Sequence, residues 1–327
     1  MASGFRTHEV RELAWVFNGP GLLSPAHFGS RIESDADLQN RFVRFRDVIS
    51  DLDQNPRDLL EFLKQRPTGG RLGRYFENLL QYYLLHLEGV TKHALNLQVR
   101  EGRRTVGELD LVFKIGQTLP VHWEASVKFY LCSTESPAEA VDPQFFMGTL
   151  VHDRLDRKIK KLFESQLRLP DHPEAREKLR ELGLEAPRSR AIMKGFFFYP
   201  SRTDWPRAAH PAEVSTNHLR GWWTTASRLE IPKFDQDSRY IVLPFARWLA
   251  PFDGRVEPHE LIQLDELQWK VRRLFDSSWA RPVNYELMIA EVAVKEETSE
   301  GPWVTERSRG NILHPKWPEH ARTSLVV

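Results

Sequence analysis

The chain has 327 residues, of which 46 are Lys or Arg and 45 are Asp or Glu, and it contains a single cysteine. With 41% hydrophobic and 28% charged residues, the composition is that of a globular protein and excludes disordered and collagen-like classes. One cysteine excludes an internal disulfide framework and a cysteine-based zinc cluster. The net charge of +1 gives no global nucleic-acid signature, so any phosphate-binding site has to be local.

The sequence carries no run of the roughly 18 to 20 apolar residues that span a bilayer. Its first residues lack the apolar core of a signal peptide, and the single cysteine fits a reducing compartment. We therefore expect a cytoplasmic protein with no membrane partner.

The predicted elements alternate between helices and strands. Apolar residues three and four positions apart predict the helices, and alternating apolar and polar residues predict the strands. Breaks containing Gly and Pro separate several of them. In chain order we expect helices over 9–24 and 36–65, a break at 66–70, a helix over 71–87, strands over 94–100, 106–113 and 121–131, a helix over 150–168, a charged linker over 171–190 and a strand over 191–199.

The rest of the chain predicts a smaller α+β segment. We expect a strand near 240–243, a helix near 259–276 and a strand near 283–294, whereas the last thirty or so residues are polar and are expected to be poorly ordered. The predicted fold class is α/β, with a mixed central sheet flanked by helices. The expected division is a helical N-terminal segment (1–65), a core (66–200) and an α+β C-terminal segment (201–327) packed on the core.

The third predicted strand carries the most informative pattern. Alternate residues of a strand share a face, and the odd positions from Val121 to Leu131 are all apolar. In the second strand Glu108 and Asp110 likewise alternate with apolar residues. One face of these strands therefore belongs to the core, and the other carries chemically capable groups. On the third strand these groups are His122, Glu124, Ser126, Lys128 and Tyr130.

Adjacent strands would bring Asp110, Glu124 and Lys128 onto one face. Two carboxylates a few ångströms apart repel each other and favour a cation between them, and Mg²⁺ or Mn²⁺ accepts such hard oxygen ligands. A nearby lysine would orient a metal-bound water or help to deprotonate it, and both cations would stabilise charge on phosphoryl oxygens. This pattern predicts metal-assisted hydrolysis of a phosphodiester.

The same residues resemble a known signature. Residues 107–110, Gly-Glu-Leu-Asp, followed by Glu124 and Lys128, are similar to the motif of the PD-(D/E)XK nuclease superfamily, and the order helix, three strands, helix, strand resembles its core. The resemblance implies a restriction-endonuclease-like fold with Asp110 and Glu124 as metal ligands and Lys128 as the residue that activates water. Glu77, on the preceding helix, matches an auxiliary metal ligand of that superfamily.

A second resemblance extends over most of the chain. Six strings, in order, are similar to the bacterial family called domain of unknown function 1853, which is grouped with PD-(D/E)XK nuclease-like proteins. The strings are RLGRYFENLLQYYL, GELDLVF, HWEASVKFYL, DRLDRKIKKLFESQLRLP, KGFFFYP and HLRGWW.

The spacing of the acid and the lysine departs from the superfamily pattern of acid-x-Lys. The position two before Lys128 is Ser126, and the acid, Glu124, lies four before it, which displaces it by about 7 Å along the strand. A bulge could restore the geometry, and Glu108 or Glu77 could supply the missing ligand. Otherwise the site binds metal poorly and the protein is inactive.

Simpler interpretations of these acids remain open. Glu124 and Lys128 could form a salt bridge on a solvated face of the sheet. Glu77 could pair with Arg71 or Arg74 at the start of its helix.

Three neighbouring polar residues also have two interpretations. His122 shares the face of Glu124 and could be a metal ligand or base, although a structural role is simpler. Glu108 could be a solvated neighbour. Gln166 could point at the site, since some related nucleases use a glutamine there, but a solvated helix residue is the simpler interpretation.

Basic residues around these elements could contact a phosphate backbone, or they could form a solvated face. The adjacent residues Trp222 and Trp223 could stack on bases, although core packing is the simpler interpretation, and Cys132 is expected to be buried. The candidates for nucleic-acid contacts are Arg71, Arg74, Arg103, Arg104, Lys158, Lys161 and Gln166.

The predicted function is therefore a nuclease dependent on Mg²⁺ or Mn²⁺ that acts on DNA or RNA. The alternative is a catalytically inactive protein on a nuclease-like scaffold that binds nucleic acid or joins a protein complex. A third interpretation is a metal-dependent hydrolase of another phosphate ester.

Overall fold

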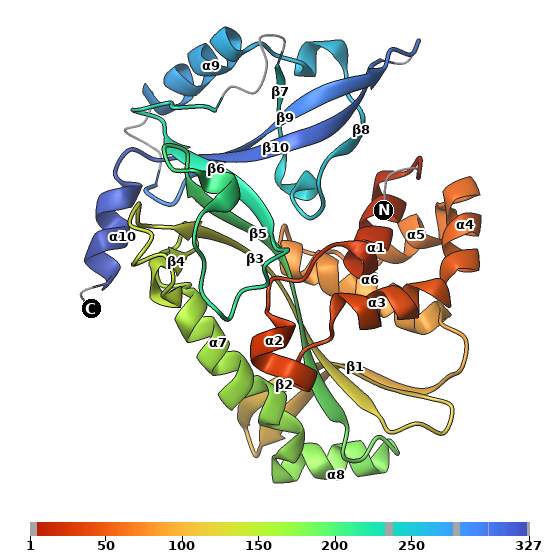
Figure 1. Ribbon diagram of the computed structural model, residues 1–327. Coiled ribbons are helices and arrows are strands. Elements are labelled where there is room, and N and C mark those ends of the chain that lie inside the picture. Colours follow the sequence, from red (N-terminus) through yellow and green to blue (C-terminus); the bar gives the residue numbers. More distant parts are fainter. Residues whose placement is uncertain (1–4, 233–237, 277–281, 300, 326–327) are drawn as a thin grey trace. The chain divides into compact units, whose positions relative to one another are not determined.

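The computed structural model describes residues 5–232, 238–276, 282–299 and 301–325 (Figure 1). The chain forms two compact units that are interleaved in sequence. Unit 1 contains residues 1–127, 158–194 and 215–217, and unit 2 contains 128–157, 195–214 and 218–327. Three elements, β3 (Val121–Cys132), α7 (Leu155–Glu164) and β5 (Arg188–Pro200), begin in one unit and end in the other.

Unit 1 combines a group of helices with antiparallel strands. Besides its parts of β3, α7 and β5, its elements are α1 (His8–Asn18), α2 (Pro25–Phe28), η1 (Gly29–Arg31), α3 (Asp35–Val43), α4 (Arg46–Gln54), α5 (Arg57–Lys64), α6 (Leu72–His86), β1 (Val90–Glu101), β2 (Arg104–Ile115), η3 (Gln166–Asp171) and α8 (Pro173–Glu181).

Local chemistry sets the bounds of the N-terminal helices. Ser34 and Asp37 form a capping box at the start of α3, in which each side chain accepts a hydrogen bond from the other residue's backbone N–H. Pro56 disfavours a helical Asn55, so α4 ends at Gln54 and α5 begins after the proline. Three helices therefore replace the one or two expected over 36–65.

The strands of unit 1 form an antiparallel ladder in which β1 pairs with β2 and β2 with β3. Tyr83 of α6 packs against Trp123 of β3, with ring centroids 6.3 Å apart. The helices η3 and α8 pack on strands β1 and β2 through a buried apolar cluster. Its members are Val99, Leu109, Val112, Leu169, Ala175, Leu179 and Leu184.

Unit 2 contains both parallel and antiparallel pairs. Its elements are η2 (Pro143–Phe145), β4 (Phe146–Met147), η4 (Trp205–Arg207), β6 (Leu219–Thr225), β7 (Arg239–Val242), η5 (Phe245–Arg247), β8 (Asp253–Arg255), η6 (Pro258–Glu260), α9 (Leu264–Asp276), β9 (Glu286–Glu296), β10 (Trp303–Leu313) and α10 (Trp317–Leu325).

In unit 2, β6 runs parallel to both β5 and β10, while β9 is antiparallel to β10 and β7. Helix α9 packs on this sheet through Leu267 and Val271, which are fully buried with Trp222 and Ile289. Trp223 is also buried and meets Trp317 of α10 edge-on. The interpretation of Trp222 and Trp223 as core residues is therefore confirmed, and so is the burial of Cys132.

Several predicted bounds were wrong. The first helix ends at Asn18 rather than at 24. The helix expected over 150–168 is α7 followed by the 3₁₀ helix η3, which contains Pro170. The expected linker over 171–190 contains α8, because Ala175 and Leu179 are buried one helical turn apart. The C-terminal residues expected to be poorly ordered form β10 and α10.

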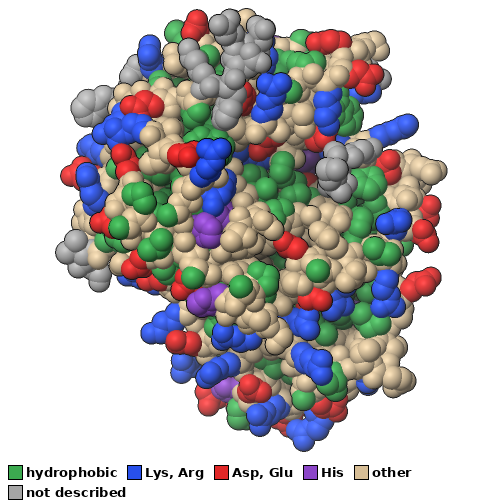
Figure 2. Space-filling view, in the orientation of Figure 1, with side chains coloured by type: hydrophobic (Ala, Val, Ile, Leu, Met, Phe, Trp, Pro, Cys, Tyr) green, Lys and Arg blue, Asp and Glu red, His purple; other side chains and the backbone are tan. Residues whose placement is uncertain are grey.

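The helices and the mixture of parallel and antiparallel pairings confirm the α/β class. In the part of the chain that the structure describes, no helix has the length and apolarity needed to cross a membrane. Figure 2 shows acidic and basic side chains interspersed over the face that it displays, as the balanced composition predicts.

Candidate functional site

Two carboxyl groups from neighbouring strands meet in unit 1. Asp110 of β2 accepts a hydrogen bond at Oδ2 from the backbone N–H of Ala125, with N and O 2.9 Å apart. This contact fixes Asp110 beside Glu124 of β3, where the two carboxyl groups interact electrostatically. Glu124 is only 3% exposed. The expectation that these two acids lie on adjacent strands and face each other therefore agrees with the structure.

Both carboxyl groups hold a proton to a higher pH than isolated acids do. Burial raises the pKa of Glu124, and the negative charge of Asp110 raises it further. Burial also raises the pKa of Asp110, although the N–H of Ala125 and the charge of Lys158 act in the opposite direction. The interpretation of Glu124 as a residue on a solvated face is wrong, since β3 is covered here on both sides.

A glutamine holds Glu124 from the helical side, and a lysine in turn holds the glutamine. Gln166, the first residue of η3, donates from Nε2 to Oε1 of Glu124. Lys158 of α7 donates from Nζ to Oε1 of Gln166 at 3.0 Å, and its charge lowers the pKa of both carboxyl groups. The interpretation of Gln166 as a solvated residue is wrong, because the end of α7 and the turn into η3 direct its amide to Glu124.

Glu77 of α6 adds a third carboxyl group to this region. Its Oε2 lies 3.4 Å from Nη1 of Arg74, which is also 3.9 Å from Oε1 of Glu108. Burial raises the pKa of Glu77 to about 7, and the charge of Asp110 adds to this effect. Both interpretations of Glu77 therefore describe part of its surroundings, since it pairs with Arg74 and also interacts with Asp110.

Sequence reasoning missed Asn96 and Gln81, which position Glu108. Asn96 donates from Nδ2 to Oε1 of Glu108 at 3.1 Å and accepts from Nε2 of Gln81 at 2.7 Å. Its φ of 51° lies in the left-handed region, which asparagine tolerates better than most residues do. The only available signal was an asparagine inside a predicted strand, where this residue type is depleted.

A cavity of about 810 Å³ opens beside the carboxyl pair in unit 1. Glu108 and Asp110 line it from β2. Lys161 and Arg168 line it from α7 and η3, with His172 next to them. The cavity therefore combines acidic groups on the strands with basic groups on the helical side.

The other basic candidates are exposed residues at element ends. Arg71 precedes α6 and donates to the backbone oxygen of Thr68 at 3.4 Å. Arg103 lies in the turn between β1 and β2, and Arg104 is the first residue of β2. Of the predicted nucleic-acid contacts, Lys161 lines the cavity itself, as does Gln166.

His122 is buried next to Glu124. Its Nδ1 lies 3.1 Å from Oγ of Ser189, and its Nε2 lies 3.8 Å from Oε2 of Glu124. Burial lowers the pKa of His122 to about 4, so the imidazole is neutral at neutral pH. This environment favours the structural interpretation of His122.

Lys128 belongs to unit 2, where it has an acidic partner that sequence reasoning missed. Its Nζ donates to Oδ2 of Asp153 at 2.7 Å. The hydroxyl of Tyr130 donates to Oδ1 of the same carboxylate at 3.2 Å. The ammonium of Lys128 is therefore held by Asp153.

The donor set of the carboxyl pair suits a hard divalent cation. No cluster of three or more His, Cys, Asp or Glu side chains within the described ranges is arranged to hold a metal ion. Mg²⁺, however, is commonly bound through one or two carboxylates and keeps several waters. Oε2 of Glu124 is buried and has no hydrogen-bond partner among the described groups. Asp110 and Glu124 are therefore the residues that could hold such an ion, with water completing its coordination.

Comparison with known proteins gives one match. The model of the family described as a domain of unknown function, DUF1853, matches residues 11–313. No curated protein and no solved structure matches the chain. Because the family model covers most of its length, the chain belongs to the family called domain of unknown function 1853.

Proposed function

We propose that the protein is a nuclease of the PD-(D/E)XK type that hydrolyses phosphodiester bonds of DNA or RNA with Mg²⁺ or Mn²⁺. The observation that carries this proposal is the pair of half-buried Asp110 and buried Glu124, whose pKa values are both raised. Two carboxyl groups held close together and partly shielded from water are unfavourable as two anions. A divalent cation removes this penalty, which is a reason for a protein to keep such a pair.

The chain's own residues would hold and orient the reacting groups. The ion would supply an activated water and stabilise charge on the phosphoryl oxygens. Ala125 fixes Asp110, and Gln166 fixes Glu124. Lys161 and Arg168 carry positive charge at the cavity, where they would attract the phosphate backbone of a substrate.

Two lysines are candidates for the cation that assists hydrolysis. Resemblance assigns water activation to Lys128, and its partner Asp153 would hold the ammonium in place. Lys158 acts directly on the carboxyl pair, because its charge lowers both pKa values. We propose that Lys158 supports cation binding, whereas Lys128 acts in the chemical step and Glu77 is an auxiliary ligand.

The proposal is tested by cleavage of mixed single- and double-stranded DNA and RNA in the presence of Mg²⁺ or Mn²⁺. Asp110→Asn and Glu124→Gln should abolish metal-dependent cleavage with the thermal unfolding midpoint retained. Asp171→Asn is the matched control, because Asp171 is an exposed acid at the rim of the same cavity. Full activity of both site variants, or equal loss of activity in the control, would refute the assignment.

A second candidate function is nucleic-acid binding without cleavage. It is favoured by the spacing of Glu124 and Lys128, which departs from the superfamily pattern, and by the ion pair of Lys128 with Asp153. In that case labelled DNA or RNA would bind, with binding weakened by Lys161→Ala and Arg168→Ala. The bound strand would then stay uncleaved with or without metal, in the wild type and in the Asp110 and Glu124 variants alike.

A further inference from the structure

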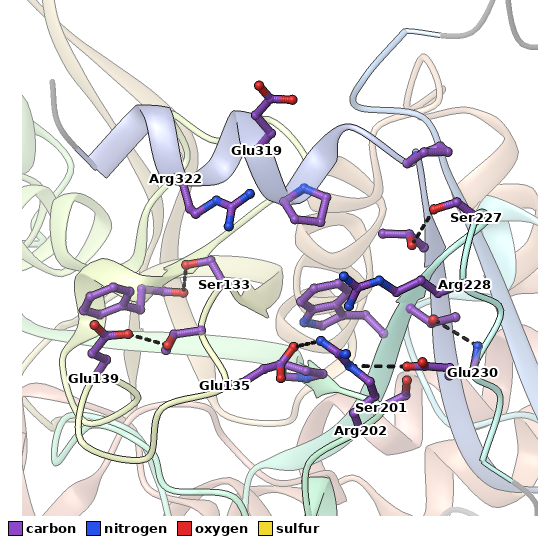
Figure 3. Close-up of a pocket in the computed structure, with 18 of the residues that line it drawn as sticks. Ser133, Glu135, Glu139, Ser201, Arg202, Ser227, Arg228, Glu230, Glu319 and Arg322 are labelled. Carbon is purple, nitrogen blue, oxygen red and sulfur yellow. Dashed lines mark hydrogen bonds and ion pairs between the residues drawn. The ribbon is translucent and has the colours of Figure 1, made fainter.

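Unit 2 contains a second cavity of about 630 Å³ that the proposed nuclease site does not use (Figure 3). Its walls come from the segment after β3, the end of β5, the end of β6 with the turn that follows, and α10. A volume of this size is typical of small-molecule sites. Hydroxyl and charged side chains make up most of its lining.

One arginine in this cavity is already neutralised. Arg202 donates from Nη2 to Glu135, and its Nε lies 3.3 Å from Oε2 of Glu230. The backbone N–H of Glu230 donates to Oγ1 of Thr224 at 3.2 Å. These contacts fix Arg202 between two carboxylates and make it part of the wall.

Two further arginines bring positive charge to the cavity from separate elements. Arg228 follows β6, and Arg322 projects from α10. In the part of the chain that the structure describes, neither guanidinium has an ion-pair partner. Figure 3 shows Arg322 directed toward the cavity, whereas the carboxylate of Glu319, another lining residue of the same helix, is directed toward the other side of the helix. The remaining acid, Glu139, accepts a hydrogen bond from Thr134.

The rest of the lining is preorganised and rich in hydroxyl groups. The hydroxyls of Thr225 and Ser227 are 3.1 Å apart. Ser133 donates to the backbone oxygen of Phe145 at 3.0 Å. The indole of Trp223 is held by a 2.8 Å hydrogen bond to the backbone oxygen of Cys132. A ligand would therefore meet fixed donors and acceptors rather than an apolar surface.

We propose that this cavity binds a small phosphate monoester that carries several hydroxyl groups, the chemistry shared by sugar phosphates and nucleoside monophosphates. Arg228 and Arg322 would bind the phosphate, because guanidinium groups match phosphate oxygens in pairs. The carboxylates of Glu135 and Glu230 would accept hydrogen bonds from the sugar hydroxyls. Because the cavity contains both arginines and glutamates, we expect its ligand to carry an anionic group for the former and neutral hydroxyl donors for the latter.

The test is calorimetric titration of the full chain, without divalent metal, with four probes: ribose 5-phosphate, adenosine 5′-monophosphate, ribose and inorganic phosphate. Ribose 5-phosphate or the nucleotide should bind at least about tenfold more tightly than ribose and inorganic phosphate, since each charge-assisted hydrogen bond contributes that much or more. Tighter binding of the nucleotide assigns the site to nucleotides, and tighter binding of ribose 5-phosphate assigns it to sugar phosphates.

Variants connect the binding to this cavity. Arg228→Ala and Arg322→Ala should each weaken binding of the preferred probe at least about tenfold. Arg272→Ala is the matched control, because Arg272 is an exposed arginine of α9 in the same unit. Absence of binding by both phosphorylated probes would overturn the proposal. Equal affinity of the Arg322→Ala and control proteins would also overturn it, and so would inorganic phosphate binding as tightly as the esters.

Discussion

Gln166 donates a hydrogen bond from Nε2 to Oε1 of Glu124, which lies 42 positions earlier in the chain. This contact joins η3 to β3 within unit 1 and continues to Lys158 through the other end of the amide. The amide thereby fixes one oxygen of Glu124 and leaves Oε2 without a hydrogen-bond partner among the described groups. We propose that this buried oxygen, which lies 3.8 Å from Nε2 of His122, is the one that would bind a cation.

Removing this amide should weaken cation binding. We expect Gln166→Ala to lower the affinity for Mn²⁺ about tenfold, because a hydrogen bond to a charged group contributes about 1.5–3 kcal/mol. Gln98→Ala is the control, since Gln98 is an exposed glutamine of β1. Titration of both variants with Mn²⁺ measures the effect, and equal affinities would show that Gln166 has no positioning role.

Glu77 should make the metal-free protein less stable as the pH rises. Its pKa is raised from 4.5 to about 7 in the folded state, so the folded protein keeps a proton that the unfolded chain loses. The favourable contribution of Glu77 to the free energy of unfolding is complete below pH 4.5 and is lost as the pH rises through 7. A shift of this size corresponds to about 3 kcal/mol.

The Glu77→Gln variant removes this titration. We expect it to be more stable than the wild type at pH 8, with the difference vanishing near pH 4, as measured by urea unfolding. Glu88→Gln, an exposed acid just after α6, should leave the pH profile unchanged. A wild-type stability that does not fall between pH 5 and 8 more steeply than that of Glu77→Gln would contradict this assignment.

Substitutions of the two candidate lysines should affect different properties: cation binding for Lys158 and cleavage for Lys128. Lys158→Ala should shift cation binding to higher pH, because the carboxyl pair loses a nearby positive charge that lowers its pKa values. Lys128→Ala should retain cation binding and lose cleavage. Lys160→Ala, an exposed lysine on the same helix as Lys158, is the control. If Lys158→Ala and Lys160→Ala bind Mn²⁺ with the same pH dependence, Lys158 has no role in cation binding.

Gly107 allows η3 to approach β2 closely. A Cβ atom at this position would lie 2.7 Å from Cδ2 of Leu169, so an alanine requires the leucine to move. We expect Gly107→Ala to reduce the free energy of unfolding by about 1–3 kcal/mol through overpacking. A double-mutant cycle with Leu169→Ala should show coupling between the two positions, and strict additivity would argue against this contact.

Most elements of unit 1 that carry the site could be predicted from the sequence. The apolar spacing over 71–87 predicts α6, and the alternation over 121–131 predicts β3, because burial of one face imposes these periods directly. The expected proximity of Asp110 and Glu124 agrees with the structure, since pairing of neighbouring strands follows from their short connection. Membership in the family is confirmed as well.

Contacts that join distant segments could not be predicted in this way. The direction of the Gln166 side chain depends on where α7 ends and η3 begins, and no local pattern encodes that turn. The partner of Lys128, Asp153, lies in the stretch expected to begin a helix over 150–168, whereas α7 begins only at Leu155. The last strand was missed because its polar composition masks β10, whose burial comes from its three partner strands β6, β8 and β9.

The central claim is that Asp110 and Glu124 bind a divalent cation, and calorimetric titration with Mn²⁺ tests it most directly. Titrations at pH 6 and pH 8 compare the wild type with Asp110→Asn and the rim control Asp171→Asn. We predict that the wild type and the control bind one ion, more tightly at pH 8 and with release of protons, because the raised pKa values leave protons on the pair. Asp110→Asn should not bind. Equal Mn²⁺ binding by Asp110→Asn and the wild type, or no binding by the wild type at either pH, would contradict the claim.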